Sequence, residues 1–169
     1  MTAVRSASAG KTLIRDFEPA RDREAVIACV AGLQDYERSL DPELPPGERV
    51  ARRYVDAMLQ RCRAYQGRVL VAEQDDAVVG FLCVLARVPE QQVDEQSRPH
   101  AMVGELYLAP EQRSQGLGRR LLDEAEAFAR DRGAKRLRVQ VLAGNGIARS
   151  LYAAAGFHER LIELEKRLT

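Results

Sequence analysis

The chain has 169 residues, of which 46% are hydrophobic and 30% are charged. These proportions are typical of a folded globular protein and exclude disorder over most of the length. We expect one domain, because a single core already buries most of the surface of a chain of this size. Residues 1–10 are predicted to be a loose leader, and residues 11–169 the domain.

The charge is nearly balanced, since 26 lysines and arginines face 25 aspartates and glutamates, for a net charge of +1. Interspersed charges of this kind do not form the basic surface patch that is typical of nucleic-acid-binding proteins. The longest apolar run, residues 77–86, is about half of the roughly 20 residues that a membrane span requires, and residues 1–10 do not resemble a signal peptide. We therefore predict a cytoplasmic protein with no nucleic-acid or membrane partner.

The three cysteines are Cys29, Cys62 and Cys83. Their number is odd, and their spacing fits neither a disulfide framework nor a zinc site. They are predicted to be reduced packing residues, and no metal is expected.

The first part of the chain predicts one strand and two helices. Residues 13–17 form a short strand, and apolar residues at helical spacing predict a helix over 22–36. Prolines interrupt the pattern over 35–47, where we expect an acidic loop. A second helix is expected over 48–63.

A hairpin and another strand follow. Residues 68–74 and 77–87 flank a two-aspartate turn, and the second of these strands is apolar on both faces. Such a strand is central and covered on both sides. A polar loop over 88–99 leads to a strand over 102–109.

Helices and strands alternate in the last third of the chain. We expect a helix over 114–131, a strand over 136–142, a short helix over 145–155 and a terminal strand. The order βααβββαβαβ predicts an α/β fold with one mixed sheet of six to seven strands and helices on both faces. The apolar side of the terminal strand carries Ile162, Leu164 and Leu168.

The segment 106–122, LYLAPEQRSQGLGRRLL, has the features of an anion site. Gly116 and Gly118 fall where a strand gives way to a helix, so the backbone can approach an anion closely. The unpaired N–H groups of a first helical turn and the positive end of its dipole favour negative charge. The spacing fits neither a Walker A loop nor a dinucleotide fingerprint. The alternative is an ordinary glycine turn with surface arginines.

Two further motifs extend this pattern. Three motifs follow one another as Arg113-x-x-Gly116-x-Gly118, then Asn145, then Tyr152 before Gly156-Phe157. With these motifs the chain resembles the GNAT superfamily of N-acetyltransferases, by motif over about residues 68–160 and by element order over its whole length.

The resemblance implies acetyl-CoA as co-substrate and a primary amine as acceptor, with direct attack in a ternary complex. Pantetheine would pair with the backbone of Leu106, Tyr107 and Leu108, beside a bulge, and would be hydrogen-bonded by Asn145. Tyr152 would protonate the departing thiolate. The pyrophosphate would be held by the loop of Arg113, Ser114, Gln115, Gly116, Leu117, Gly118 and Arg119. Without a ligand, Asn145 could be a helix cap and Tyr152 a packed helix residue.

The reaction also needs a base and an oxyanion donor. An amine with a pKa near roughly 10 must lose a proton before it attacks. Glu105 is the candidate base, and alternation places it with Val103 and Tyr107, opposite Leu106 and Leu108. His100 and a water relay are alternatives, and Glu105 could instead be a structural glutamate paired with an arginine. The Leu108 amide is the candidate oxyanion donor.

The acceptor is expected under the loops 35–47 and 88–99. An acidic rim there would attract a polyamine, an aminoglycoside-like compound, a lysine side chain or a peptide N-terminus. A non-catalytic acyl-CoA-binding or regulatory module of the same fold is the alternative function, and a homodimer is possible because relatives often pair. The acidic residues are Asp35, Glu37, Asp41, Glu43, Glu90, Asp94 and Glu95.

Overall fold

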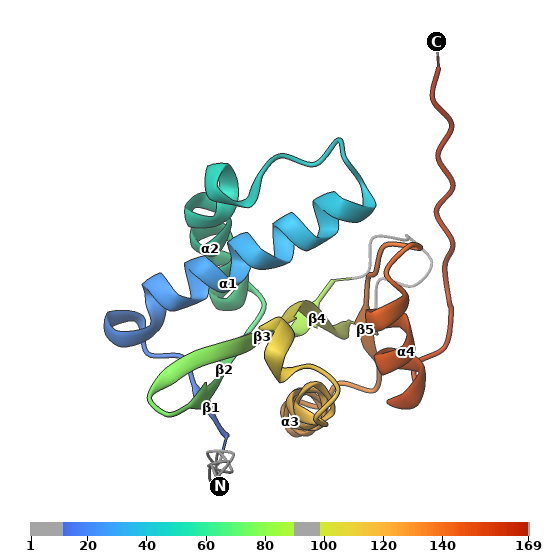
Figure 1. Ribbon diagram of the computed structural model, residues 1–169. Helices are drawn as coiled ribbons and strands as arrows, with labels where there is room; N and C mark the ends of the chain where they lie inside the picture. The colour runs from blue at the N-terminus through green and yellow to red at the C-terminus, as the bar shows by residue number, and fades with distance from the viewer. Residues whose placement is uncertain (1–11, 90–98, 169) are drawn as a thin grey trace, which may run out of the picture.

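A computed structural model describes residues 12–89 and 99–168 of the chain (Figure 1). It contains one sheet in the order β1-β2-β3-β4-β5, with helices on both faces. The predicted α/β class is therefore confirmed. The predicted count of six to seven strands is wrong for the described residues, which form five.

The sheet is mixed. The first four strands pair antiparallel in sequence order, and the last pairs parallel to its neighbour, β4. The strands are β1 (Leu13–Asp16), β2 (Arg68–Gln74), β3 (Ala77–Val88), β4 (His100–Leu108) and β5 (Leu137–Val139).

The first helix is longer than its sequence pattern predicted. It continues to Leu40, so the expected loop over 35–47 is wrong for its first six residues. Pro42 is the first residue that cannot extend the helix, and the residue before a proline is itself biased away from helical geometry. The helices are α1 (Pro19–Leu40), α2 (Gly47–Ala64), α3 (Leu117–Asp131) and α4 (Gly146–Ala154), with a 3-10 turn η2 (Pro110–Gln112) before α3.

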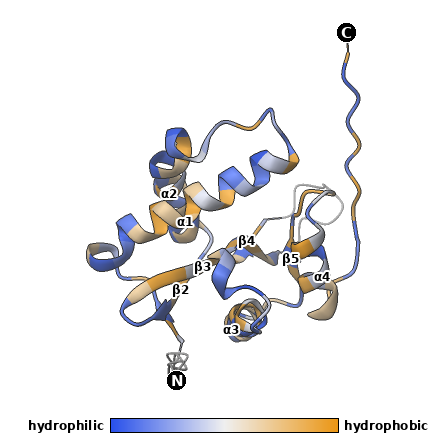
Figure 2. Cartoon of the chain, in the orientation of Figure 1, coloured by the Kyte–Doolittle hydropathy of each residue, from blue (hydrophilic) through white to orange (hydrophobic). Residues whose placement is uncertain are grey.

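Strand β3 separates two cores. Phe81 and Cys83 point to the side covered by α1 and α2, whereas Leu82 and Val84 point to the side covered by α3 and α4. All four are fully buried, and Figure 2 shows the hydrophobic colour along this part of the sheet. The prediction of a central strand covered on both faces is confirmed.

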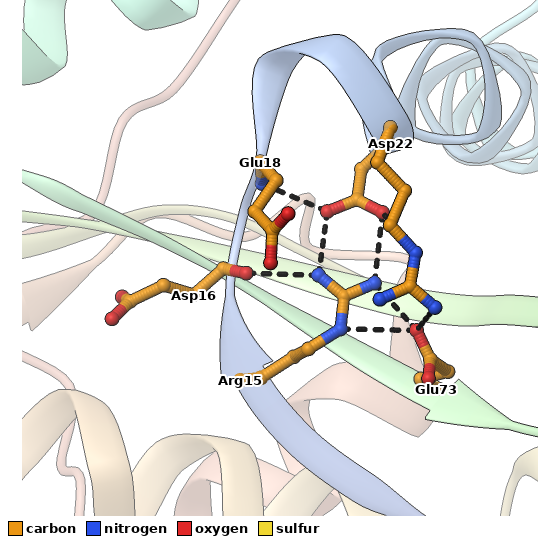
Figure 3. A network of polar contacts seen from close by, with 6 residues as sticks. Arg15, Asp16, Glu18, Asp22 and Glu73 are labelled. Atoms are coloured by element: carbon orange, nitrogen blue, oxygen red, sulfur yellow. Dashed lines mark hydrogen bonds and ion pairs between the residues drawn. The ribbon is translucent and has the colours of Figure 1, made fainter. Parts of the chain in front are cut away.

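A network of ion pairs fixes the start of the fold (Figure 3). The Arg15 guanidinium on β1 donates hydrogen bonds of 2.6 and 2.8 Å to the buried Asp22 carboxylate on α1 and one of 3.0 Å to Glu73 on β2. Asp22 also accepts a 2.8 Å bond from the Glu18 backbone N–H. Hydrogen bonding from Arg15 lowers the pKa of Asp22. The network therefore joins two strands to the first turn of α1.

The predicted terminal strand does not form. Residues 157–168 adopt neither helix nor strand and, beyond α4, extend clear of the sheet (Figure 1). Ile162 is 70% exposed, and Leu164 and Leu168 are each 90% exposed. Alternation supplies an apolar side, but a strand also needs a neighbouring edge with which to pair.

The described helices and the cysteines were each compared with what the sequence predicts. None of the described helices combines the length and apolar composition needed to cross a bilayer. Cys29, Cys62 and Cys83 are free thiols, as the spacing indicated.

Candidate active site

Strands β4 and β5 separate after a short stretch of pairing. They pair only from Ala101 to Val103 on β4, whereas β4 itself continues to Leu108. A cavity of about 50 Å³ opens where they part. Its lining comes from α1 (Leu33, Glu37), β4 (Gly104, Glu105, Leu106), the end of β5 (Val139, Gln140, Val141) and α4 with its cap (Asn145, Ala148, Tyr152).

A β-bulge lies at the point of separation. Val103 pairs with Val84 and Glu105 with Cys83, so Gly104 is an extra residue on β4. The bulge reverses the alternation of side chains. The prediction that Glu105 shares a side with Val103 is therefore wrong, because Val103 packs in the α3/α4 core while Glu105 faces α2.

The edge of β4 beyond the bulge offers backbone groups to the gap. The Ala109 N–H donates to the Val79 carbonyl on β3 at 2.9 Å. In an antiparallel pair, successive residues turn their backbone groups alternately toward and away from the partner. Leu106 and Leu108 consequently face the gap, and the backbone of Tyr107 faces β3.

The loop after β4 exposes a series of amides. Ser114 and Gly116 have φ values of 60° and 78°, which turn neighbouring N–H groups toward one concave side. Within the described ranges, the amides of residues 114–119 have no hydrogen-bond partner, and the first N–H to bond is that of Arg120, which donates to the Gly116 carbonyl at 3.1 Å. A Cβ on Gly116 would meet nothing within 4 Å. The loop can therefore receive an anion on its backbone.

The arginines of this loop are engaged with the protein. Arg113 Nε donates to the Leu108 carbonyl at 3.1 Å, and its guanidinium lies over the rings of Tyr36 and Tyr107. Arg119 donates to Asp123 at 2.8 Å. The backbone of the loop, rather than these side chains, is therefore left without partners among the described residues.

Leu117 and Gly118 belong to the packing between α3 and its neighbours. Leu117 is buried in the α3/α4 core. A Cβ on Gly118 would lie 3.0 Å from Leu151 Cδ2, so the glycine allows α4 to approach α3 closely. Only the backbone amides of these two residues remain for a ligand.

Asn145, the N-cap of α4, and Tyr152 in this helix both line the cavity. Asn145 Oδ1 accepts a 3.0 Å bond from the Ala148 N–H, so the expected alternative role as a helix cap is present. Tyr152 is buried and packs edge-on against Phe157. Burial, followed by the charge of Glu37, raises the pKa of Tyr152 to about 12. At neutral pH its hydroxyl is therefore protonated and can donate.

Glu105 is held by α2. Its Oε1 accepts a 2.8 Å hydrogen bond from the Tyr54 hydroxyl and another from the Arg61 guanidinium. Its side chain is only 2% exposed, and Oε2 has no partner in the described part of the chain. The alternative prediction of a glutamate paired with an arginine is thus found, although the carboxylate is buried.

The sequence placed Glu37 only in an acidic rim, and it gave Tyr54 and Arg61 no role in a site. A helical signal was available for all three. Glu37 continues the apolar stripe of Val26, Val30 and Leu33 at helical spacing, and Arg61 continues that of Tyr54 and Met58. A charged residue on the apolar side of a helix marks a candidate site.

The other described residues of the predicted acidic rim bind partners within the protein. Asp35 accepts a 2.7 Å bond from the Gly47 N–H, and Glu43 pairs with Arg167. Asp41 accepts a bond from the Glu43 N–H. Glu90, Asp94 and Glu95 lie outside the described residues.

His100 lies away from the cavity. It begins β4, opposite Val88, and is buried at the end of the strand remote from the bulge. The cavity lining does not include it. His100 therefore does not lie where a base for the amine in this cavity would have to lie.

Comparisons with known proteins agree with this architecture. The sequence model of the acetyltransferase (GNAT) family matches residues 30–157. The chain is 31% identical over 99 residues to the uncharacterized N-acetyltransferase YhfO of Bacillus subtilis (strain 168). The aligned residues make up 59% of this chain and 64% of YhfO, so the chain spans less than two thirds of the length of that relative. The tetramutant of the BH1408 protein from Bacillus halodurans has a TM-score of 0.78 at 15% identity, covering 92% of this chain and 99% of its own. Aminoglycoside N-acetyltransferase AAC(6')-Iy, in complex with CoA, has a TM-score of 0.68 at 19% identity, covering 96% and 99%. The chain belongs to the GNAT acetyltransferase family.

Proposed function

We propose that the chain is an acetyl-CoA-dependent N-acetyltransferase that acylates a primary amine by direct attack in a ternary complex. One observation supports the proposal above all. Beyond Val103 the edge of β4 is not paired with β5, and this edge leads to the loop of residues 114–119, whose amides have no partner within the described residues. The edge suits an extended pantetheine chain, and the loop suits a diphosphate.

The cofactor contacts follow from this placement. The amides of residues 114–119 would hold the diphosphate, and the backbone of Leu106 and Leu108 would pair with pantetheine. Asn145 uses Oδ1 to cap α4, which leaves the Nδ2 donors for the pantetheine amides. The structure of the similar aminoglycoside N-acetyltransferase holds CoA, which supports the assignment of this ligand.

Three groups would serve the chemistry. Tyr152 donates a proton to the departing thiolate, since its hydroxyl stays protonated at neutral pH. The Leu108 N–H faces the gap and would stabilise the oxyanion. Removal of a proton from the amine requires a base, and the two carboxylates that line the cavity are Glu105 and Glu37.

The cavity between β4 and β5 suits a cationic amine better than the larger groove between α1 and α2. That groove, of about 370 Å³, is lined mainly by apolar groups and carries one charge, the cation of Arg53. A polyamine, a lysine side chain, a peptide N-terminus or an aminoglycoside amine would instead be drawn to Glu37. We therefore place the reacting nitrogen in the smaller cavity.

Turnover with a mixed amine panel tests the proposal. The protein is incubated with acetyl-CoA and with spermidine, kanamycin, a lysine peptide or a peptide with a free N-terminal alanine. Free CoA is quantified by chromatography, which avoids the reaction of protein cysteines with thiol reagents. We expect amine-dependent release of CoA. Binding of CoA without release by any amine would instead indicate a non-catalytic acyl-CoA-binding module.

A further inference from the structure

We propose that Glu37, rather than Glu105, removes the proton from the acceptor ammonium and thereby generates the attacking amine. The inference rests on the proposed acetyl transfer and assigns its base. Glu37 comes from α1 and lines the cavity together with residues of β4, β5 and α4.

The position of Glu37 is suited to this role. Its side chain is half-buried and lines the cavity together with Asn145 and Tyr152. Within the described residues its carboxylate has no hydrogen-bond or ion-pair partner, unlike Asp35 and Glu43 on the same side of the fold. A carboxylate taken partly out of water without a partner is free to bind an ammonium group.

Glu105 has a different environment. Two donors from α2, Tyr54 and Arg61, bind the same oxygen, and the residue is almost fully buried. A base that keeps a guanidinium partner gives up part of that interaction when it takes a proton. The second oxygen, Oε2, is buried without a partner in the described part of the chain and keeps negative charge at the cavity wall.

The two carboxylates are electrostatically coupled. Burial, and then the negative charge of Glu105, raises the pKa of Glu37. The groups that act on the cavity are Glu105 on β4, Tyr152 on α4 and, behind Glu105, Tyr54 and Arg61 on α2. The raised pKa of Glu37 lies closer to the pH at which the enzyme operates, and a general base is most effective when its pKa is near that pH.

The proton balance is complete without a further reagent. Of the three protons on the ammonium nitrogen, one passes to Glu37 and then to solvent. The freed lone pair forms the C–N bond while the carbonyl π electrons move to oxygen as the oxyanion, and their return then breaks the C–S bond. One proton reaches the CoA sulfur through Tyr152, and one remains on the amide nitrogen.

Glu37→Gln and Glu105→Gln distinguish the two candidate bases. We measure kcat/KM against pH with the best acceptor of the panel. In the wild type, activity should fall on the acidic side as Glu37 becomes protonated. Glu37→Gln should lose roughly 100-fold at pH 7, and the loss should shrink as the pH approaches the pKa of the free amine, about 10.

Glu105→Gln should keep the acidic limb and move it to lower pH, because removal of the Glu105 charge lowers the pKa of Glu37. Glu48→Gln, an exposed change at the start of α2, is the matched control and should leave the profile unchanged. An acidic limb that persists in Glu37→Gln but disappears in Glu105→Gln would overturn the inference. Wild-type protein that turns over no amine would overturn the proposed function instead.

Discussion

Arg61 on α2 forms an ion pair with the buried carboxylate of Glu105 on β4. The Arg61 side chain remains 42% exposed and that of Glu105 only 2%, so one partner stays in contact with water while the other does not. The pair fixes α2 against the strand that borders the cavity.

Arg61→Ala should therefore destabilise the fold. It leaves the Glu105 charge buried with only the Tyr54 hydroxyl, and we expect a loss of about 2 kcal/mol, below the usual cost of breaking a buried pair because Arg61 is partly solvated. Urea denaturation measures the loss. Addition of Glu105→Gln should recover part of it, and strictly additive losses in the double variant would contradict the coupling.

Asp22→Asn tests the network of Figure 3. The pKa of Asp22 is lowered in the folded state, so its stabilising effect is complete above its unfolded pKa of about 3.9 and is lost as the pH falls through the lower, folded pKa. We expect a loss of about 3 kcal/mol at pH 7 that shrinks below about pH 4. Asp56→Asn, in an exposed pair, should change little. A loss that stays constant down to pH 3 would exclude this charge effect.

Tyr152→Phe should lower kcat by roughly 10- to 100-fold while CoA affinity stays within a few fold, because a thiolate leaves readily even without a donor. With a pKa of about 12, Tyr152 should give the wild type no titration limb below pH 10. Tyr65→Phe, at the end of α2, is the control. An unaltered rate at every pH would remove Tyr152 from the mechanism.

Cys62 should be the most reactive thiol. A hydrogen bond from Cys83, whose sulfur lies 3.2 Å away, lowers the pKa of Cys62, whereas burial raises that of Cys29 to about 11. Since the thiolate is the nucleophile, maleimide should label Cys62 first at pH 7.5. Peptide mapping by mass spectrometry follows the order, and Cys83→Ala should slow the labelling of Cys62. Equal rates at Cys29 and Cys62 would contradict this environment.

Local patterns predicted the elements whose structure depends on nearby residues. The two-aspartate turn was visible in the sequence, and both aspartates adopt positive φ in the hairpin between β2 and β3. Gly133 marked the end of α3 and also has positive φ, at 77°. The turn before α3 was predicted for the same reason, since Gly116 acts locally and has positive φ, at 78°, at the start of the helix.

Features that depend on distant partners were not predictable from local patterns. The bulge at Gly104 exists only in the register between β3 and β4, and it reversed the side on which Val103 lies. The prediction of a terminal strand failed because alternation does not reveal whether a segment pairs with another strand, and residues 157–168 pair with none of the described strands. Arg61 contacts Glu105 across 44 residues of sequence, a pairing that no spacing rule indicates.

Calorimetric titration with CoA tests the central claim most directly. A glutamate at Gly116 would carry a side chain and a negative charge into the loop of open amides. Gly133→Glu is the matched control, because Gly133 has nearly the same φ and equally open space but lies at the far end of α3. We expect the wild type and Gly133→Glu to bind CoA, and Gly116→Glu to bind about 100-fold more weakly, the equivalent of two charge-assisted hydrogen bonds. Equal affinity in the two glutamate variants, or no binding by the wild type, would show that this loop does not hold the diphosphate.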